Sequence, residues 1–373
     1  MLTVKPQDGF EHYLFDKAYE NQLPINGTFE LLPICNMNCS MCYVRLTKEE
    51  MDRQGSMLSC EQWIKIARQA VKSGLLFLLL TGGETLLYPE FERLYKELRS
   101  LGLYITINTN GTLITEKIAD MFAGDLPRRV NISLYGSSDA VYEKLCHNPK
   151  GFTQVMNAIK LLKERDVPIK LNYTLTPQNE KESEEIMRIS DKIGIPVSIP
   201  TYIFPPERKK GIADISSFSR LTPEEAAKKQ LEILYKNFGQ DEDYKQNLQN
   251  ILDEIMQIER QEHMDVPSGT LCSAGVSSFW IDWKGNMTPC GMMKDPSSNL
   301  IKTDFLSSWD KIKTETKKIF TSNKCFNCKY RKCCQTCAAS AFAETGSYDG
   351  CASYHCEFCE NYEKILKEHI EQL

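Results

Sequence analysis

The run Ile34-Cys35-Asn36-Met37-Asn38-Cys39-Ser40-Met41-Cys42-Tyr43 decides how the rest of the chain is interpreted. Its C-x3-C-x2-C spacing places three thiols on one tight loop, directly after a short apolar stretch. A [4Fe–4S] cluster usually takes four cysteines, so three ligands leave one iron open for a further ligand. Zinc or disulfide chemistry is the alternative, but zinc sites usually combine two short ligand pairs, and no second pair lies near this loop.

A second motif, Thr81-Gly82-Gly83-Glu84, follows the apolar run Leu75–Leu80. Six apolar residues that end in two glycines predict a buried parallel strand and its exit turn. Glycines at such a turn let the backbone approach a ligand closely, and the carboxylate of Glu84 can accept hydrogen bonds from an ammonium group.

Together the two motifs resemble those of radical S-adenosylmethionine (radical SAM) enzymes. The resemblance implies a [4Fe–4S] cluster on Cys35, Cys39 and Cys42, with its open iron chelated by the amino and carboxylate groups of S-adenosylmethionine. The Gly-Gly-Glu turn would hold the amino group of this cofactor. Reductive cleavage would give methionine and a 5′-deoxyadenosyl radical that abstracts a substrate hydrogen, with flavodoxin or ferredoxin as the low-potential electron donor.

Strands and helices alternate along the first half of the chain. Between the strands, apolar residues recur at the helical period, which predicts helices that pack on a sheet. Six strand–helix repeats imply a parallel sheet curled into part of a barrel, with the chemistry at the C-terminal ends of the strands. We therefore expect an α/β fold, the (β/α)6 partial barrel of the radical SAM family. The predicted strands are Thr28–Leu32, Leu75–Thr81, Tyr104–Asn108, Val130–Leu134, Ile169–Leu175 and Val197–Thr201.

Two further strand ends carry polar residues that suit the cofactor. Asn110 follows the third predicted strand, and Ser133 lies in the fourth. Their amide and hydroxyl groups could bind ribose or carboxylate oxygens, although a turn or a strand-end cap explains them equally simply. The predicted cofactor-binding residues are thus Gly82, Gly83, Glu84, Asn110 and Ser133.

The composition narrows the class of protein. The chain has 373 residues, a net charge of −5 and fifteen cysteines. The acidic balance gives no electrostatic footprint for nucleic acid. The N-terminus lacks the pattern of a secretion signal, and no stretch is apolar enough to span a membrane, so a reducing cytoplasm and metal ligation by cysteine are expected. We expect no separate leader-peptide-binding domain in the short stretch before Cys35.

The C-terminal third holds ten of the fifteen cysteines. Ser278–Trp283 alternates like a strand, and Lys284-Gly285-Asn286 can turn the chain back, so that Cys272 and Cys290 approach each other across a hairpin. This region, with Glu344-Thr345-Gly346 before its last cysteines, resembles the SPASM extension of radical SAM maturases, a small cysteine-rich domain that binds up to two auxiliary [4Fe–4S] clusters.

The resemblance also implies which cysteines bind these clusters. Cluster I would take Cys272, Cys290 and Cys337, and three protein ligands leave room for one open iron. Cluster II would take Cys325, Cys328, Cys334 and Cys356. The spacing differs from the usual one, so Cys333 can replace Cys334, and Cys351 or Cys359 can replace Cys356. Zinc remains the alternative for the C-x2-C pairs.

Cys146, in Val141–His147 after the fourth strand, belongs to neither cluster. A buried inert thiol is the simpler interpretation, and a catalytic thiol that donates a hydrogen atom is the alternative. The predicted domains are an N-terminal extension at 1–27, the radical SAM partial barrel at 28–205, a helical connector at 206–265 and the SPASM domain at 266–373.

The resemblance implies a peptide or protein substrate. Maturation of a ribosomal peptide by thioether or carbon–carbon cross-linking, or by epimerisation, is the first hypothesis. Formylglycine formation in a sulfatase is the second. An iron–sulfur electron-transfer protein is the third, and the Gly-Gly-Glu motif speaks against it because electron carriers need no amino-acid cofactor site.

Overall fold

The computed structural model describes residues 9–206, 219–257, 269–331, 333–334 and 336–373. None of the helices described in these ranges is long and apolar enough to cross a membrane.

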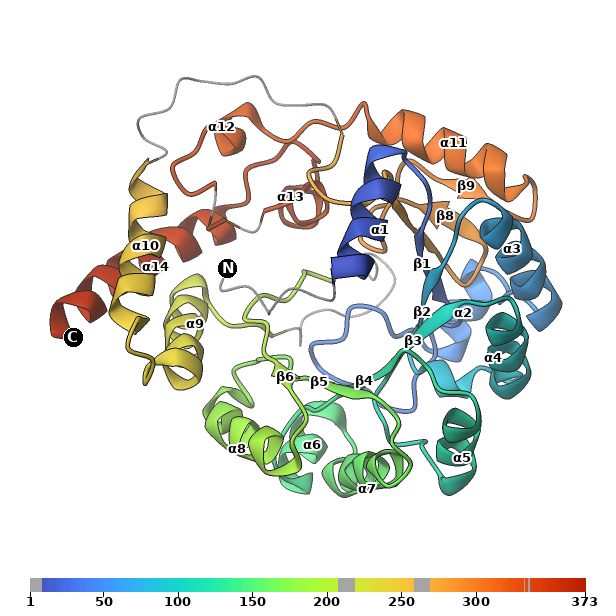
Figure 1. The fold of residues 1–373 in the computed structure, drawn as a ribbon, viewed down its shortest axis with the longest axis horizontal. Coiled ribbons are helices and arrows are strands. Elements are labelled where there is room, and N and C mark those ends of the chain that lie inside the picture. Colours follow the sequence, from blue (N-terminus) through green and yellow to red (C-terminus); the bar gives the residue numbers. More distant parts are fainter. Residues whose placement is uncertain (1–8, 207–218, 258–268, 332, 335) are drawn as a thin grey trace.

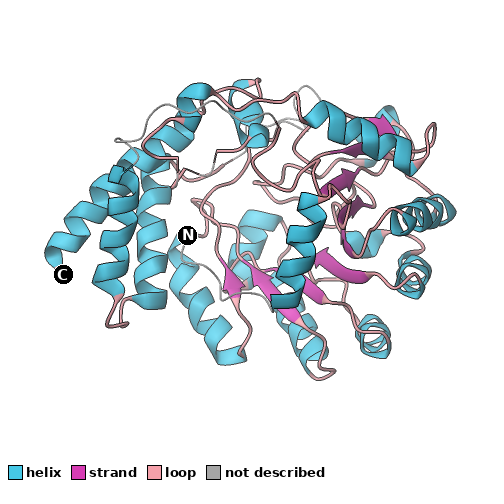
Figure 2. Ribbon diagram, turned by 45° about the horizontal axis from the view of Figure 1, so that its top comes forward, coloured by secondary structure: helices cyan, strands magenta, loops and turns pink. Residues whose placement is uncertain are grey.

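Six parallel strands form the centre of the molecule and follow one another in chain order across the sheet. The strands make an arc rather than a closed ring (Figure 2), because β6 has only β5 as a hydrogen-bonded neighbour. All six predicted strands exist, each within a few residues of its predicted position, which confirms the partial barrel. Their bounds are β1 Asn26–Glu30, β2 Phe77–Thr81, β3 Tyr104–Thr109, β4 Arg129–Ser133, β5 Ile169–Asn172 and β6 Val197–Ser198.

Helices surround the outer side of this arc (Figure 1). The starts of the first two of these helices, α2 and α3, are encoded in the local sequence. Thr47 caps α2 and Ser59 caps α3, each in a capping box that satisfies N–H groups which a helix start leaves free. The bounds are α2 Lys48–Gln54, α3 Cys60–Lys72, η1 Thr85–Leu87, α4 Phe91–Ser100, α5 Glu116–Gly124, α6 Asp139–Cys146, α7 Gly151–Lys163, η2 Glu180–Glu182 and α8 Ser183–Ile193.

The main core lies between the sheet and these helices. Phe29 of β1 stacks on Trp63 of α3 with ring centroids 4.7 Å apart, and both are fully buried. Since side chains alternate along a strand, the residues on either side of Phe29 face the concave side of the sheet instead. Thr28 and Glu30 are therefore directed into the barrel.

Helix α1, Gly9–Glu20, covers the N-terminal end of the barrel. Phe15 stacks on Phe77, the first residue of β2, and Glu11 forms an ion pair of 2.6 Å with Arg128, which precedes β4. This end of the barrel is thus covered by the chain itself.

The predicted C-terminal hairpin exists and extends the barrel sheet. Strand β7, Ser278–Ile281, pairs in parallel with β1, and β8, Asn286–Thr288, returns antiparallel to it and is followed by β9, Ser298–Asn299. The sheet therefore has nine strands in the order β6-β5-β4-β3-β2-β1-β7-β8-β9. The sequence indicated the hairpin but not its place beside β1.

A separate layer of three helices lies beside the barrel, whereas α11, Phe305–Thr316, packs against α3, β8 and β9. Helices α9 and α10 come from the predicted connector and pack against the last helix, α14, with Leu248 and Leu366 fully buried between them. The predicted domain limits stay a prediction, and residue 266, where the SPASM domain is predicted to begin, lies outside the described residues. The bounds are α9 Pro223–Phe238, α10 Tyr244–Gln257, α11 Phe305–Thr316, α12 Asn323–Phe326, α13 Ala338–Thr345 and α14 Ser353–Gln372.

Candidate active site

A cavity of about 420 Å³ lies at the C-terminal ends of the barrel strands. All three cysteines of the predicted cluster loop line it: Cys35, Cys39 and Cys42. Four of the five predicted cofactor-binding residues line it too: Gly82, Gly83, Asn110 and Ser133. The structure therefore brings two sequence motifs about forty residues apart, and two further strand ends, to one site. Their binding roles stay predictions.

The cysteine loop is held from the barrel side by Asn110. Its side-chain amide donates to the Cys35 sulfur at 3.6 Å and to Asn36 Oδ1 at 2.9 Å. Backbone N–H groups also donate to two of the sulfurs, from Met37 to Cys35 at 3.4 Å and from Arg45 to Cys42 at 3.3 Å. Hydrogen bonds to sulfur favour the thiolate form, which is the form that binds iron.

The same loop is held from the other side by the end of α6. Asn38 N–H donates to the Cys146 carbonyl at 3.1 Å, and Ser40 N–H donates to the Leu145 carbonyl at 3.0 Å. These contacts hold the loop backbone at Asn38 and Ser40. Burial raises the pKa of the Cys35 thiol to about 12, and ligation by the irons of a cluster would offset this effect by stabilising the thiolate.

The two glycines of the second motif have a role that the sequence analysis did not foresee. A Cβ added to Gly82 would lie 2.4 Å from the Leu32 carbonyl oxygen, and one added to Gly83 would lie 2.3 Å from that of Ile34. The turn instead hydrogen-bonds this segment, from Gly83 N–H to Leu32 O at 2.7 Å. The glycines thus let the β2 exit turn pack directly against the start of the cysteine loop.

Glu84 is fully buried and does not line the cavity. Its carboxylate accepts hydrogen bonds from Thr109 Oγ1 at 2.7 Å, Asn110 N–H at 2.7 Å and Leu86 N–H at 3.0 Å. Burial raises the pKa of this carboxyl, and the three hydrogen bonds oppose that effect. In this structure Glu84 joins the ends of β2 and β3 behind the cavity wall.

Cys146 is also fully buried, and it does not line the cavity. Its thiol hydrogen-bonds that of Cys39, which raises the pKa of Cys39. This placement matches the buried-thiol interpretation, and the predicted catalytic role stays a hypothesis.

The C-terminal cysteines form two neighbouring groups. The sulfurs of Cys351 and Cys356 are 3.4 Å apart, and Cys351 also hydrogen-bonds Cys325. Cys359 is buried and contacts both Cys333 and Cys334. None of the fifteen cysteines forms a disulfide bond. The cysteines that the spacing left as alternatives thus lie among the predicted cluster II ligands, so the ligand set stays open.

In the described parts of the chain, no three His, Cys, Asp or Glu side chains converge closely enough to hold a single metal ion. The predicted cluster I ligands come from separate segments: Cys272 and Cys290 lie on either side of β7 and β8, and Cys337 caps the start of α13.

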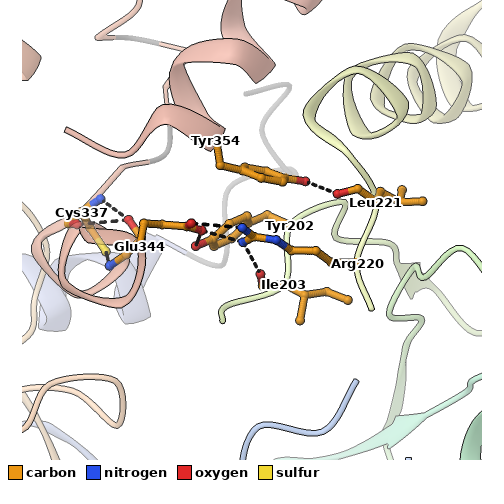
Figure 3. A network of polar contacts seen from close by, with 8 residues as sticks. Tyr202, Ile203, Arg220, Leu221, Cys337, Glu344 and Tyr354 are labelled. Carbon is orange, nitrogen blue, oxygen red and sulfur yellow. Dashed lines mark hydrogen bonds and ion pairs between the residues drawn. The ribbon is translucent and has the colours of Figure 1, made fainter. Parts of the chain in front are cut away.

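A polar network joins the barrel exit to α13 (Figure 3). Arg220 forms two hydrogen bonds with Glu344, at 2.5 and 3.0 Å, and Tyr202 donates to the same carboxylate at 2.9 Å. Arg220 also donates to the carbonyl of Ile203, a cavity residue, at 3.3 Å, and lies 4.2 Å from the Tyr354 ring. The Arg220 contacts help to hold the pKa of Glu344 low against its burial. Helix α13 connects this network to Cys337.

Among the residues of the cavity wall that sequence reasoning missed are Glu30 and Trp280. Glu30 is the last residue of β1, and Trp280 lies in β7. A carboxylate inside the apolar run Phe29–Leu32 was a usable signal, because alternation along the strand directs it away from the core. The sequence gives no such signal for Trp280, because the position of Trp280 at the cavity depends on the pairing of β7 with β1.

Comparison with known proteins agrees with this site. Residues 29–189 match the model of the Radical SAM superfamily. An AdoMet-dependent heme synthase of Methanosarcina barkeri is 23% identical over 326 residues, which are 86% of this chain and 93% of that protein. The sporulation killing factor maturation protein SkfB of Bacillus subtilis is 29% identical over 170 residues, 46% of this chain and 40% of that protein.

Among solved structures, Streptococcus suis SuiB bound to its precursor peptide SuiA superposes with a TM-score of 0.66 at 16% identity. The match covers 95% of this chain and 84% of SuiB, so it includes the C-terminal region as well as the barrel. At this identity the match shows a shared fold.

Proposed function

Because the chain belongs to the radical SAM superfamily, we propose that it is a peptide maturase that removes a hydrogen atom from a peptide or protein substrate. Enzymes of this superfamily use a [4Fe–4S] cluster and S-adenosylmethionine, which together supply the radical chemistry that breaks an unactivated C–H bond. The observation that carries the proposal is the meeting of three thiols from one loop with the Gly82–Gly83 turn at a cavity on the C-terminal strand ends.

The chain's own residues would have three tasks. Cys35, Cys39 and Cys42 would bind the cluster, and Asn110 would hold the loop through its bonds to Cys35 and Asn36. The Gly82–Gly83 turn and Ser133 would bind the cofactor from the cavity wall. The buried wall itself would exclude water from the reacting atoms.

The substrate class rests on the fold of the whole chain. The match to SuiB extends over the C-terminal region, and the solved SuiB complex contains a precursor peptide. The maturation protein SkfB supports the same class through its sequence. Cross-linking, epimerisation and formylglycine formation all remain within this proposal.

Heme synthesis is a second candidate, because sequence relatives of that name match most of the chain. Tetrapyrroles carry several carboxylates, and cationic side chains usually bind such groups. None of the described residues that line the cavity is Lys, Arg or His, and one of them, Glu30, is itself a carboxylate. These described residues offer no cationic partner for the carboxylates of a tetrapyrrole, so heme synthesis stays the second candidate.

Mass spectrometry of candidate substrates tests the proposal. The anaerobically reconstituted enzyme, S-adenosylmethionine and a reductant are incubated with peptides encoded beside the gene, or with an iron tetrapyrrole precursor. We expect 5′-deoxyadenosine together with a changed peptide. Loss of two hydrogen atoms would indicate a cross-link, deuterium gained from heavy water would indicate epimerisation, and conversion of cysteine to an aldehyde would indicate formylglycine. Conversion of the tetrapyrrole alone would contradict the proposal.

A further inference from the structure

Each sulfur of the cysteine loop has a hydrogen-bond partner in the protein, and the partner of Cys39 differs from the others. Backbone N–H groups donate to Cys35 at 3.4 Å and to Cys42 at 3.3 Å. Cys39 instead meets the thiol of Cys146. The proposed chemistry assigns no task to this contact between two thiols.

The backbone on both sides of Cys39 sets the contact. The N–H groups of Asn38 and Ser40 donate to the carbonyls at the end of α6, at 3.1 and 3.0 Å. These two bonds hold Cys39 against the last turn of α6 without the help of either thiol. Cys39 lines the cavity, whereas Cys146 is 0% exposed and does not line it. The predicted cluster ligand thus has a buried thiol behind it.

Iron ligation decides which sulfur donates. A thiolate bound to iron has no hydrogen to give, so the hydrogen of this contact comes from the Cys146 S–H group once Cys39 binds iron. Reduction of a [4Fe–4S] cluster adds negative charge, part of which lies on the sulfur ligands. A hydrogen bond to such a sulfur therefore stabilises the reduced state more than the oxidised state and raises the reduction potential. Burial strengthens the effect, because the local dielectric is low.

We propose that the Cys146 thiol donates a hydrogen bond to Cys39 in the loaded enzyme and thereby raises the reduction potential of the first cluster. Cys146 acts through Cys39 and is thus a positioning residue, which needs no contact with the substrate. The inference rests on the proposed ligation of iron by Cys39 and is independent of the substrate class.

Potentiometric titration followed by electron paramagnetic resonance tests the proposal on the anaerobically reconstituted full chain. The signal of the first cluster is recognised by its change when S-adenosylmethionine is added, because the cofactor binds at the open iron of this cluster. Cys146→Ala removes the donor, and Cys146→Ser replaces the weak S–H donor with a stronger O–H donor. Cys60→Ala is the matched control, because Cys60 is an equally buried thiol at the start of α3.

The midpoint potential of the first cluster should become more negative in Cys146→Ala and more positive in Cys146→Ser. Cys60→Ala should keep the wild-type potential. Iron content should be equal in all four proteins. If Cys146→Ala does not retain the cluster, the sign of the shift in Cys146→Ser decides alone.

An unchanged potential in a Cys146→Ala variant that retains the cluster would overturn the proposal. Negative shifts in both Cys146 variants would overturn it too, because they would assign the effect to packing instead of a donated hydrogen. A wild type without a signal that responds to S-adenosylmethionine would overturn the proposed function and this inference together. A responsive signal whose potential does not depend on Cys146 would overturn the inference alone.

Discussion

At the scale of single residues, the Gly-Gly-Glu motif acts through the protein's own backbone in this structure. Gly82 and Gly83 allow the β2 turn to touch the start of the cysteine loop, and Glu84 joins that turn to the end of β3. Asn110 then continues from β3 back to Cys35. The motif therefore contacts the cysteine loop directly through its glycines and indirectly through Glu84 and Asn110.

The first prediction concerns Glu84. A glutamine has one acceptor oxygen, so Glu84→Gln would direct its NH2 group at one of the donors now bound by the carboxylate. We expect the affinity for S-adenosylmethionine to fall about tenfold or more, as the loss of a hydrogen bond to a charged group implies. Calorimetric titration checks this, with Glu92→Gln as the control. Wild-type affinity in Glu84→Gln would show that Glu84 neither contacts the cofactor nor positions the residues that bind it.

Gly83 gives a second prediction at this scale. In Gly83→Ala the new methyl group would lie 2.3 Å from the Ile34 carbonyl oxygen, which is backbone and cannot move without displacing the cysteine loop. We expect weaker retention of the first cluster and a lower unfolding midpoint. Gly124→Ala is the matched control, because nothing lies within 4 Å of its added Cβ. Equal iron content and stability in the two variants would refute the close packing of this turn.

At the scale of secondary-structure elements, the Arg220–Glu344 pair connects the barrel exit to the cysteine-rich region. The side chains of Arg220 and Glu344 are 22% and 10% exposed. If one of them is removed, little water can therefore reach the charge of the other. Removal of one partner of a buried pair leaves an uncompensated charge and costs about 3–5 kcal/mol.

We therefore expect Arg220→Ala to lower the free energy of unfolding by about 3–5 kcal/mol. Lys228→Ala, which removes the partner of Glu224 in an exposed pair on α9, should cost less than about 1 kcal/mol. Urea denaturation followed by circular dichroism measures both. If the two variants lose similar stability, the pair does not hold the two regions together.

The barrel strands were predictable because each is a short apolar run followed by a turn. The motifs were predictable because their spacing is local. The pairing of β7 with β1 was not, since it joins residues some 250 positions apart and leaves no periodic signal. For the same reason Trp280 was missed at the site. The cluster II ligands could not be chosen from spacing, and the structure places Cys351 and Cys359 beside the candidates rather than excluding them.

At the scale of the whole molecule, β7 to β9 continue the barrel sheet, so the two predicted domains share one sheet. Removal of the C-terminal region would leave β1 with β2 alone as a partner strand, so point variants are the better test of the auxiliary clusters. The reconstituted wild type should hold about twelve irons per chain. A variant with alanine at the seven predicted auxiliary ligands should hold about four. Stoichiometric zinc with only about four irons in the wild type would contradict the auxiliary clusters.

The most direct test of the central claim is cleavage of S-adenosylmethionine by the chain that lacks Cys35, Cys39 and Cys42. With alanine at these three positions, the reconstituted enzyme should lose about four irons and keep the auxiliary clusters. Chromatography under reducing conditions should then detect 5′-deoxyadenosine from the wild type and none from the variant. Undiminished formation of 5′-deoxyadenosine by the variant would contradict the assignment of this loop as the site of radical formation.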